Sequence, residues 1–432
     1  MMSLLGDARR NVLSGAARPL VTGAVARVVG LRFDVSGVQA GLGDEVWVER
    51  TGVKGVVVGL DGDTVACMPL GDISGLRAGD RVVTTGALPT CPVGWDLLGR
   101  VLDGMGDPLD GSSVMHLERC TLEQDVPHPL NRKLIREPLA LGVRAWDATA
   151  TLGRGQRVGV FAGSGVGKST LMGMVARNTA ADVNVVALIG ERGREVREFI
   201  ENDLGPEGLK RSVLVVATSD QPALVRTRAA FMATRIAEWF RDQGSDVLLM
   251  MDSVTRFCMA QREIGLAAGE MPAARGYTPS VFATLPKLLE RAGSSDTGSV
   301  TGIYTVLVDG DDHNEPISDA SRSILDGHIT LSRAIAHRNH YPAIDVLASV
   351  SRVMSSVTES NNRKDAGKLR QLMAALAEAK DLIEIGAYAP GSNPVVDEAL
   401  TRRSAIDAFL QQDTHEKAEF QDTWRLLNEV VS

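Results

Sequence analysis

The pattern of apolar and polar positions changes twice along this chain of 432 residues. Residues 21–90 contain short β-prone runs punctuated by glycine, at a spacing of roughly 8–12 residues. Asp61-Gly62, in the middle of this region, is a hairpin-turn signal. Short strands at such a spacing are typical of a small closed barrel. The pattern therefore predicts a small β-barrel domain over residues 21–92, preceded by an N-terminal segment of residues 1–20.

The apolar runs become longer from about residue 155 and alternate with helical segments such as 223–243. Near-continuous apolar runs fit strands that are buried on both faces of a parallel sheet. These runs are 157–163, 183–190, 212–218, 246–252 and 302–308. Because strands alternate with helices, we expect right-handed crossovers and an α/β domain, which we place at residues 93–350.

The strand signal stops at about residue 355. Segments 364–386 and 416–431 have the periodicity of amphipathic helices, so residues 351–432 are predicted to form a helical C-terminal domain. Residues 120–137 contain two prolines, show little periodicity and are predicted to be a connector. The predicted fold class is therefore α/β, with a parallel-sheet core between a small barrel and a helical domain.

Composition and charge limit the classes of function. A hydrophobic content of 44% with 23% charged residues is ordinary for a soluble globular protein. The net charge of −8 offers no general attraction to nucleic acid, so we expect no nucleic-acid partner. No apolar run reaches the ~18 residues of a membrane span, and the first residues do not resemble a signal peptide. We therefore expect a cytoplasmic protein.

The placement of cysteine and histidine gives no sign of a disulfide framework or a metal cage. The four cysteines lie far apart without paired spacing, which is typical of reduced thiols in the cytosol. They are Cys67, Cys91, Cys120 and Cys258. The seven histidines are scattered, and no pair has a ligand spacing. We expect no metal centre built from protein ligands alone.

The first chemical motif is the glycine-rich segment FAGSGVGKST at residues 161–170. It follows an apolar strand and precedes a helix, which is the context that a phosphate-binding P-loop requires. Glycines at 163, 165 and 167 let backbone N–H groups turn toward phosphate oxygens, and the helix N-terminus adds a positive dipole end. Lys168 can reach the β- and γ-phosphates, and the Ser169 hydroxyl can bind Mg²⁺. The predicted nucleotide-binding residues of the loop are Gly163, Ser164, Gly165, Val166, Gly167, Lys168, Ser169 and Thr170.

The loop departs from the strict P-loop pattern at one position. Ala162 stands where that pattern has glycine, and alanine is small enough to leave the loop plausible. The alternative is a chance glycine-rich turn between a strand and a helix. Because Gly-Lys-Ser stands in the right context, we favour the phosphate loop and predict ATP with Mg²⁺ as the ligands.

Two carboxylates follow strand ends and extend this site. Asp252 ends the apolar run 246–252, and ligands of open α/β sheets bind at the carboxyl edge of the strands. Asp252 is therefore predicted to hold Mg²⁺, directly or through water. Glu191 lies just past another strand end and could orient the attacking water. From spacing alone it could equally belong to the first turn of a helix, where acidic residues are favoured.

One guanidinium interrupts an otherwise mostly apolar and hydroxylic stretch, HYPAIDVLASVSRVMSSV, at residues 340–357. Arg352 is permanently charged, so a buried position would require a partner. A salt bridge at a domain edge is one explanation. The other is a role in the phosphate site, which has room for one more cation.

In these motifs the chain resembles the hexameric RecA-like ATPases of bacterial type III protein export, which are relatives of the rotary ATP synthase catalytic subunit. The matching segments run from about residue 98 to 357. They are GRVLDGMGDPLDG, FAGSGVGKSTLM, GERGREVREFI, DSVTRFCMAQREIGLAAGEMPAARGYTPSVF, YTVLVDGDDHNEPISD, SILDGHITLSR and HYPAIDVLASVSRV. Within the family, DLIEIGAYAPGSNPVVDEA at 381–399 looks more like the flagellar export ATPase than the injectisome one.

The resemblance assigns roles to particular residues. It implies that Glu191 is the catalytic carboxylate and that Arg192 and Arg256 line the same site. It implies that Tyr341 packs on the adenine ring, and that Arg352 is an arginine finger for the neighbouring subunit. The loop DGDDHNEP, residues 309–316, would face a central channel where a stalk protein inserts.

The function implied by the resemblance is ATP hydrolysis that energises type III flagellar protein export. The enzyme would release export substrates from their chaperones and unfold them at the secretion channel. It would form a homohexamer, bind stalk and regulatory proteins, and contact a membrane export gate as a peripheral protein at the inner face of the cell membrane. In the N-terminal segment only Leu4, Leu5, Val12 and Leu13 offer an apolar face for a regulator.

Four alternatives remain beside this prediction. The first is the ATPase of a virulence injectisome. The second is an RNA or DNA translocase of the RecA-like hexamer class, but the barrel region has few aromatic residues besides Phe33 and Trp47 for a single-strand platform. The third is a non-catalytic subunit of a rotary ATPase, against which Glu191 argues. The fourth is the catalytic subunit of a proton-driven synthase, whose acidic lever motif the C-terminal sequence lacks.

Overall fold

Two compact units make up the described part of the chain. The structure, a computed structural model, describes residues 21–432 apart from 85, 87 and 309–314. The first unit contains the described residues up to Thr90 together with Glu263–Met271. The second contains Cys91–Arg262 and Pro272–Ser432. The predicted N-terminal segment lies outside the described residues.

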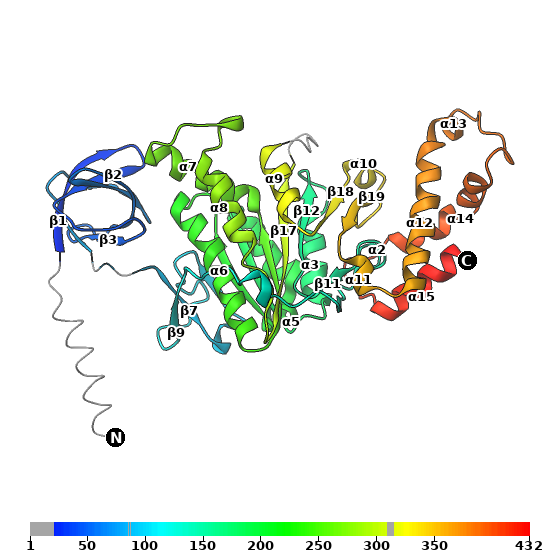
Figure 1. Ribbon diagram of the computed structural model, residues 1–432, viewed down its shortest axis with the longest axis horizontal. Helices are drawn as coiled ribbons and strands as arrows, with labels where there is room; N and C mark the ends of the chain where they lie inside the picture. The colour runs from blue at the N-terminus through cyan, green and yellow to red at the C-terminus, as the bar shows by residue number, and fades with distance from the viewer. Residues whose placement is uncertain (1–20, 85, 87, 309–314) are drawn as a thin grey trace, which may run out of the picture. The chain divides into compact units, whose positions relative to one another are not determined.

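A closed barrel of six antiparallel strands forms most of the first unit (Figure 1). At its predicted hairpin, Asp61 pairs with Thr64, and Gly62 has a φ of 57°, in the left-handed region that glycine tolerates. Apolar side chains such as Phe33 and Val35 fill the interior. The predicted small barrel is thus confirmed. In sheet order its strands are β1 (Val21–Val29), β2 (Arg32–Ser36), β5 (Thr64–Pro69), β4 (Lys54–Asp61), β3 (Glu45–Val48) and β6 (Arg81–Thr84).

A nine-stranded sheet, counted over the described residues, lies at the centre of the second unit. The order is β19-β18-β12-β17-β15-β13-β14-β8, with β16 paired to β17 at one side. All pairs are parallel except β18–β19 and β16–β17. The five predicted runs are therefore parallel strands, and the α/β core is confirmed. The strands are β8 (Val101–Asp103), β12 (Arg157–Ala162), β13 (Val183–Ile189), β14 (Ser212–Ala217), β15 (Asp246–Asp252), β16 (Gly293–Ser294), β17 (Ser299–Leu307), β18 (Gly327–Leu331) and β19 (Ile344–Ser351).

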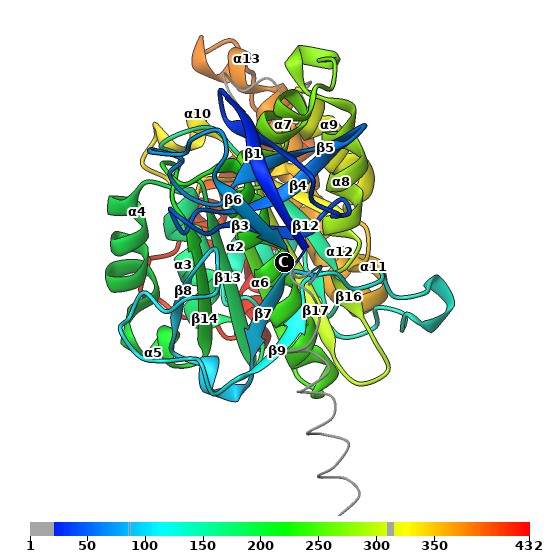
Figure 2. The ribbon, with the colours of Figure 1, turned by 90° about the vertical axis from the view of Figure 1, so that its left-hand side faces the viewer.

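Helices flank this sheet (Figure 2). The long helix α6 packs along β13, β14 and β15, and α9 packs against β12 and β17. The segment predicted as a connector begins with β9 (Glu118–Thr121), which pairs with β7 (Thr90–Val93), and has little regular structure after it. The flanking helices include α3 (Lys168–Asn178), α4 (Gly193–Glu198), α5 (Gly205–Lys210), α6 (Ala223–Asp242), α7 (Val254–Ala268), α8 (Pro279–Leu289) and α9 (Pro316–Ile324).

Helices also form the C-terminal region, as predicted. The predicted helix at 364–386 is interrupted at Ala379, where α12 ends and α13 begins. Leu369, Trp424 and Leu427 belong to the same buried apolar cluster as strand residues of the sheet, so the helices and the sheet share one core. The helices are α12 (Ser360–Glu378), α13 (Lys380–Glu384), α14 (Pro394–Leu410) and α15 (Phe420–Val431).

A short helix, α2 (Arg144–Thr149), stands between the sheet and the C-terminal helices. Its Trp146 is fully buried in the shared core. The buried Asp147 carboxylate accepts hydrogen bonds from the backbone N–H groups of Leu141 (3.0 Å) and Gly142 (2.9 Å). Because these donors would otherwise be unpaired, Asp147 fixes the turn that leads into α2.

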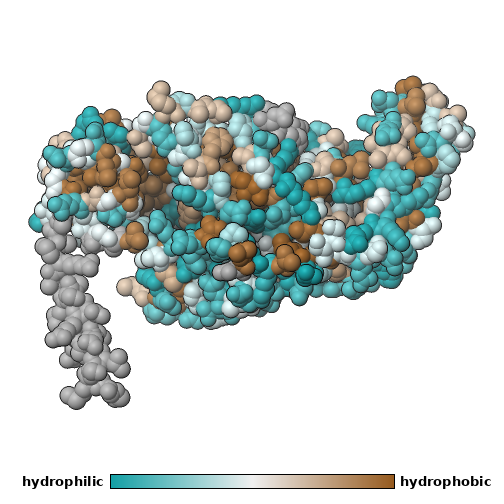
Figure 3. All heavy atoms as spheres, in the orientation of Figure 1, coloured by the Kyte–Doolittle hydropathy of each residue, from teal (hydrophilic) through white to brown (hydrophobic). Residues whose placement is uncertain are grey.

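Hydrophilic and apolar residues are interspersed on the face shown in Figure 3. Apolar spheres gather near the end of the helical region that carries α13, where Leu382 and Ile385 are exposed. Among the helices that the structure describes, none is both long and apolar enough to span a bilayer.

Candidate active site

The glycine-rich loop has the backbone geometry of a phosphate cradle. It leaves β12 at Ala162 and enters α3 at Lys168, with Gly167 as the N-cap residue. Gly165 and Gly167 have φ values of 75° and 88°, a region that side chains disfavour. The sequence therefore needs glycine at these two positions to bring backbone N–H groups and the N-terminus of α3 to one point.

Three charged side chains from different elements meet at this point. The Lys168 ammonium forms an ion pair with the Asp252 carboxylate, and its Nζ lies 3.7 Å from Glu191 Oε1. Asp252 ends β15 and Glu191 follows β13, and these two strands are parallel neighbours. Their carboxyl ends therefore share one edge of the sheet, where ligands of α/β folds bind. The predicted convergence of the loop with both carboxylates is present in the structure.

Asp252 is held in place by a residue that the sequence did not single out. Its Oδ1 accepts a hydrogen bond of 2.7 Å from the hydroxyl of Thr305, which is buried on β17. The sequence feature that could have pointed to Thr305 is a hydroxyl inside an apolar strand. Only the pairing of β15 with β17, however, places this hydroxyl beside Asp252. Thr305 and Lys168 together fix the orientation of the carboxylate.

Glu191 lies before the next helix, not within its first turn. The helix α4 begins at Gly193, and Arg192 is its N-cap residue. The Glu191 side chain is almost buried, with 9% exposure. Burial raises the pKa of Glu191 to about 7; the charge of Asp252 adds to the shift, and Lys168 opposes it.

A second carboxyl group, Glu195, hydrogen-bonds to Glu191. This contact lowers the pKa of Glu195 and raises that of Glu191. Glu195 also forms an ion pair with Arg192. Glu195 was not predicted as a site residue, because its distance from Glu191 depends on how the loop enters α4.

The two arginines predicted to line the site differ in position. The Arg192 side chain is 71% exposed and turned to Glu195. Arg256, on α7, packs beside Gly190, where an added Cβ would lie 3.0 Å from the Arg256 Cβ. Its buried Nε has no hydrogen-bond partner within the described part of the chain. An unpaired guanidinium nitrogen next to the loop of Glu191 is suited to an anionic ligand.

Tyr341 lies against the phosphate loop. Its ring carbons are 3.5 Å from the position that a Cβ at Gly167 would take, and the side chain is 40% exposed. An aromatic face is therefore available beside the end of the loop. The structure brings together the loop, Lys168, Glu191, Asp252, Arg256 and Tyr341, with Arg192 at the margin.

Arg352 is not part of this constellation. Its side chain is exposed and donates a 3.2 Å hydrogen bond to the carbonyl of Arg322. It follows β19, which runs antiparallel to β18, so it lies at the edge of the sheet where β12 begins. The P-loop follows the opposite end of β12. Arg352 therefore cannot serve the phosphate loop of its own chain.

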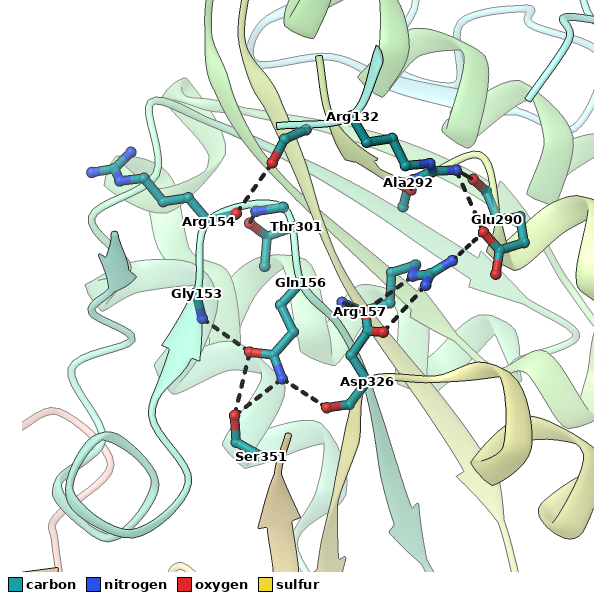
Figure 4. Close-up of polar contacts among 12 residues, drawn as sticks. Arg132, Gly153, Arg154, Gln156, Arg157, Glu290, Ala292, Thr301, Asp326 and Ser351 are labelled. Carbon is teal, nitrogen blue, oxygen red and sulfur yellow. Dashed lines mark hydrogen bonds and ion pairs between the residues drawn. The ribbon is translucent and has the colours of Figure 1, made fainter. Parts of the chain in front are cut away.

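A buried polar network fixes the backbone at Arg352 (Figure 4). Gln156 donates to the Asp326 carbonyl (3.0 Å) and to the Ser351 hydroxyl (3.1 Å), and it accepts from the Gly153 N–H (2.9 Å). The Arg352 N–H donates to the same Asp326 carbonyl at 2.9 Å. Arg157 forms an ion pair with the Asp326 side chain. The guanidinium thus projects from an anchored strand end.

Oxygen donors suited to a small divalent cation are present at the loop. The exposed Ser169, with its hydroxyl, is the second residue of α3, and the Asp252 carboxylate lies beside the neighbouring Lys168. Such hard oxygen donors fit Mg²⁺ bound together with phosphate oxygens. Over the described ranges, no group of three or more His, Cys, Asp or Glu side chains could hold a metal ion.

Two further features lie away from these residues. A cleft of about 490 Å³, lined by residues of α12 and α15 such as Asn362 and Trp424, contains none of the predicted site residues. Residues 309–314 of the predicted channel loop lie outside the described residues. The described end of that loop, Glu315, caps α9 by accepting from the N–H groups of Ile317 and Ser318.

The fold and the site define a nucleotide-binding protein with a barrel, a P-loop sheet and a helical C-terminal region. Models of the ATP synthase alpha/beta family match this chain in the beta-barrel domain (residues 25–86) and the nucleotide-binding domain (residues 142–351). The T3SS EscN ATPase C-terminal domain matches residues 358–429. The chain belongs to the ATP synthase alpha/beta family and, within it, to the flagellum-specific and type 3 secretion system ATPases. It is therefore an ATP-binding enzyme of the ATPase class, as predicted.

Individual relatives cover nearly the whole chain. The flagellum-specific ATP synthase of Bacillus subtilis is 52% identical over 95% of this chain and 95% of its own length. The type 3 secretion system ATPase of Xanthomonas euvesicatoria is 51% identical over 95% of this chain and 94% of its own. Among solved structures, assembled EscN from enteropathogenic E. coli is 46% identical, with a TM-score of 0.92, and covers 95% of this chain and 100% of that one. The structure of EscN in complex with its central stalk EscO is 45% identical, with a TM-score of 0.89, and covers 95% of this chain and 100% of that one.

Proposed function

We propose that this ATPase energises flagellar type III protein export from a site shared between neighbouring subunits. The proposal rests on one observation: the charged groups that hydrolysis requires lie at two opposite edges of the sheet. Lys168, Glu191 and Asp252 meet at one edge of the sheet, and Arg352 projects from the other. A ring of identical subunits would place the Arg352 of one subunit at the loop of the next.

Each residue has a definite part in this proposal. The phosphates lie in the loop formed by Gly163, Ser164, Gly165, Val166, Gly167, Lys168, Ser169 and Thr170. Glu191 orients the attacking water, while Lys168 and the neighbour's Arg352 stabilise charge on the transferring phosphoryl group. Arg192 and Arg256 line the site, and Tyr341 packs on the adenine.

Mg²⁺ would be held by the Ser169 hydroxyl and the Asp252 carboxylate. When bound with ATP, the ion neutralises charge on the β- and γ-phosphate oxygens. The Thr305 hydroxyl keeps Asp252 turned to the loop.

The proposed assembly is a homohexamer with a stalk protein, supported by the assembled EscN structure and its complex with the stalk EscO. Regulatory proteins, export substrates with their chaperones and a membrane export gate would be further partners. The enzyme would act in the cytoplasm, peripheral to the inner face of the membrane, and would not bind nucleic acid, in keeping with its net charge of −8. The proposed domains are 1–20, 21–92, 93–350 and 351–432.

The same enzyme in a virulence injectisome is the second candidate. The 51% identity to the Xanthomonas euvesicatoria ATPase favours it almost as much as the Bacillus subtilis relative favours the flagellar role. Both candidates share the ATPase site, so only the secreted cargo separates them.

Glu191→Gln is expected to bind ATP normally and to lower kcat about 10²–10⁴-fold, because an amide of the same shape cannot act as the base that activates water. In cells, export of flagellar hook protein into the medium should be lost. Phosphate release and the proteins of the culture supernatant are the two readouts, with the exposed Glu207→Gln as the matched control. Normal turnover in Glu191→Gln would overturn the catalytic role, and loss of injectisome cargo with normal flagellar export would favour the second candidate.

The pH profile provides an independent check on Glu191. Its pKa is raised to about 7 by burial, and the carboxylate is the active form. We therefore expect kcat/KM to fall as pH drops through about 7, approaching tenfold per pH unit on the acidic side. An exposed glutamate, with a pKa of about 4.3, would leave the profile flat from about pH 5.5 to 8. A flat profile of kcat/KM measured over that range would contradict a catalytic base whose pKa is raised to about 7.

A further inference from the structure

The segment between α14 and α15, residues 411–418, crosses the turn before α2 and the end of α3. We call it the strap. The Ala418 N–H donates to the Gly142 carbonyl, and the Arg177 side chain on α3 donates to the Thr414 carbonyl. Arg144, the first residue of α2, forms an ion pair with Glu416. The strap is therefore fastened to the turn before α2, to α2 itself and to the C-terminal end of α3, the helix that begins at the phosphate loop.

Gln412 is the buried centre of the strap, with 6% exposure. Its Oε1 accepts from the Arg144 N–H (2.8 Å), and its Nε2 donates to the carbonyls of Gly142 and Glu416 (2.8 Å each). The acceptor and both donors of the amide are thus used. A side chain with this full set of buried partners fixes the strap in one position.

The backbone of Gln412 extends this network to the nucleotide site. Its N–H donates to the Tyr341 carbonyl at 3.0 Å. The Tyr341 ring lies over Gly167, the last residue of the phosphate loop before α3. The preceding His340 is half-buried and close to Asp407 of α14. The C-terminal region therefore holds the backbone of Tyr341, whose ring contacts the phosphate loop.

We propose that Gln412 is a positioning residue that sets the Tyr341 ring for the base of the nucleotide. This inference rests on the proposed function, in which Tyr341 packs on adenine. The described hydrogen bonds of Gln412 go to residues outside the phosphate loop, so we expect it to affect the base end of the ligand and not the phosphates. If the strap is loosened, the Tyr341 backbone is no longer held, and the ring can move out of the position in which it stacks on the base.

The test compares ATP with a ligand that has the phosphates but no base. Gln412→Leu keeps the approximate size and removes the amide, while Gln411→Leu changes the exposed neighbouring glutamine and is the matched control. We expect Gln412→Leu to raise KM for ATP about three- to tenfold, with kcat within about twofold of the parent. The inhibition constant of magnesium tripolyphosphate against ATP should not change. Gln411→Leu should match the parent in all three quantities.

Two results would overturn the proposal: an unchanged KM for ATP, or a KM and a tripolyphosphate inhibition constant that rise together, which would indicate general damage to the site. If the parent protein itself fails to hydrolyse ATP, the proposed function fails instead. If Gln412→Leu does not fold, the proposal is tested by measuring amide hydrogen exchange in the strap of the parent protein. Mg-ADP should slow exchange in the strap and tripolyphosphate should not, whereas equal or absent protection by both would refute the role of Gln412.

Discussion

Replacing Arg352 by alanine is expected to leave ATP binding nearly unchanged and to lower kcat by about 10³–10⁵-fold. This loss corresponds to roughly 4–7 kcal/mol of activation free energy. Binding should survive because the loop, Lys168 and Asp252 meet at the other edge of the sheet and have no contact with Arg352 among the described interactions. Turnover should be lost because the neighbouring site then lacks the cation that stabilises the transferring phosphoryl group.

Steady-state phosphate release and nucleotide titration measure these two effects separately. Arg403, an exposed arginine on α14, supplies the matched control, because Arg403→Ala removes the same charge away from any sheet edge. If Arg352→Ala keeps kcat within threefold of the parent, the finger role is wrong. A loss of ATP affinity as large as that of a P-loop variant would also contradict it.

Replacing Lys168 by alanine should abolish both binding and turnover. Lys168 is the cation between Asp252 and Glu191, so its removal leaves two carboxylates facing a phosphate chain without compensation. We expect the Kd for ATP to rise on the order of 10²-fold or more, since a hydrogen bond to a charged group contributes about 1.5–3 kcal/mol and repulsion adds to the loss. Hydrolysis should fall below detection.

Isothermal titration with Mg-ATP measures this loss, and thermal unfolding checks that the variant is folded. Lys210→Ala is the matched control, because Lys210 is exposed on α5 and forms a surface ion pair with Glu207. If Lys168→Ala binds ATP with the affinity of the parent, the loop is not the ATP-binding site.

The strands that the sequence predicted are those with continuous apolar runs. β13, β14 and β15 are buried along almost their whole length, so every position carries the signal. β8 has only three residues, and β19 is half exposed at the sheet edge, with Leu347 and Val350 facing outward. Edge strands and very short strands lack the two-sided burial that the pattern detects, so these were not predicted.

Most of the predicted site residues stand near strand ends or in the loop itself, whereas Arg256 lies on α7. Lys168 and Asp252 follow directly from strand–loop–helix order, because parallel strands collect their carboxyl ends at one edge. For Glu191 the spacing fitted the first turn of a helix equally well, and the resemblance assigned its role. Thr305, Glu195 and Gln412 could not be selected in this way. Strand pairing brings Thr305 to Asp252, and the path of the chain into α4 brings Glu195 to Glu191. Gln412 lies in the strap, more than 240 residues after the loop in the sequence.

Topology also limits the two explanations of Arg352. The sequence left open a salt bridge at a domain edge and a role in a phosphate site. Because β19 is antiparallel to β18, its end lies away from the loop of the same chain, and the side chain there is exposed with a backbone carbonyl as its hydrogen-bond acceptor. A sequence pattern does not reveal the direction of an edge strand. The inference that Arg352 acts on a neighbouring subunit therefore depended on both the resemblance and the fold.

Mixing the two inactive variants tests the shared site most directly. Lys168→Ala subunits keep Arg352, and Arg352→Ala subunits keep Lys168, so about a quarter of the interfaces in a one-to-one mixture should pair an intact loop with an intact finger. The account predicts that ATP hydrolysis, absent from each variant alone, returns in part when subunits are mixed before assembly. Mixed assemblies that form normally and remain inactive would contradict a site shared between neighbouring subunits.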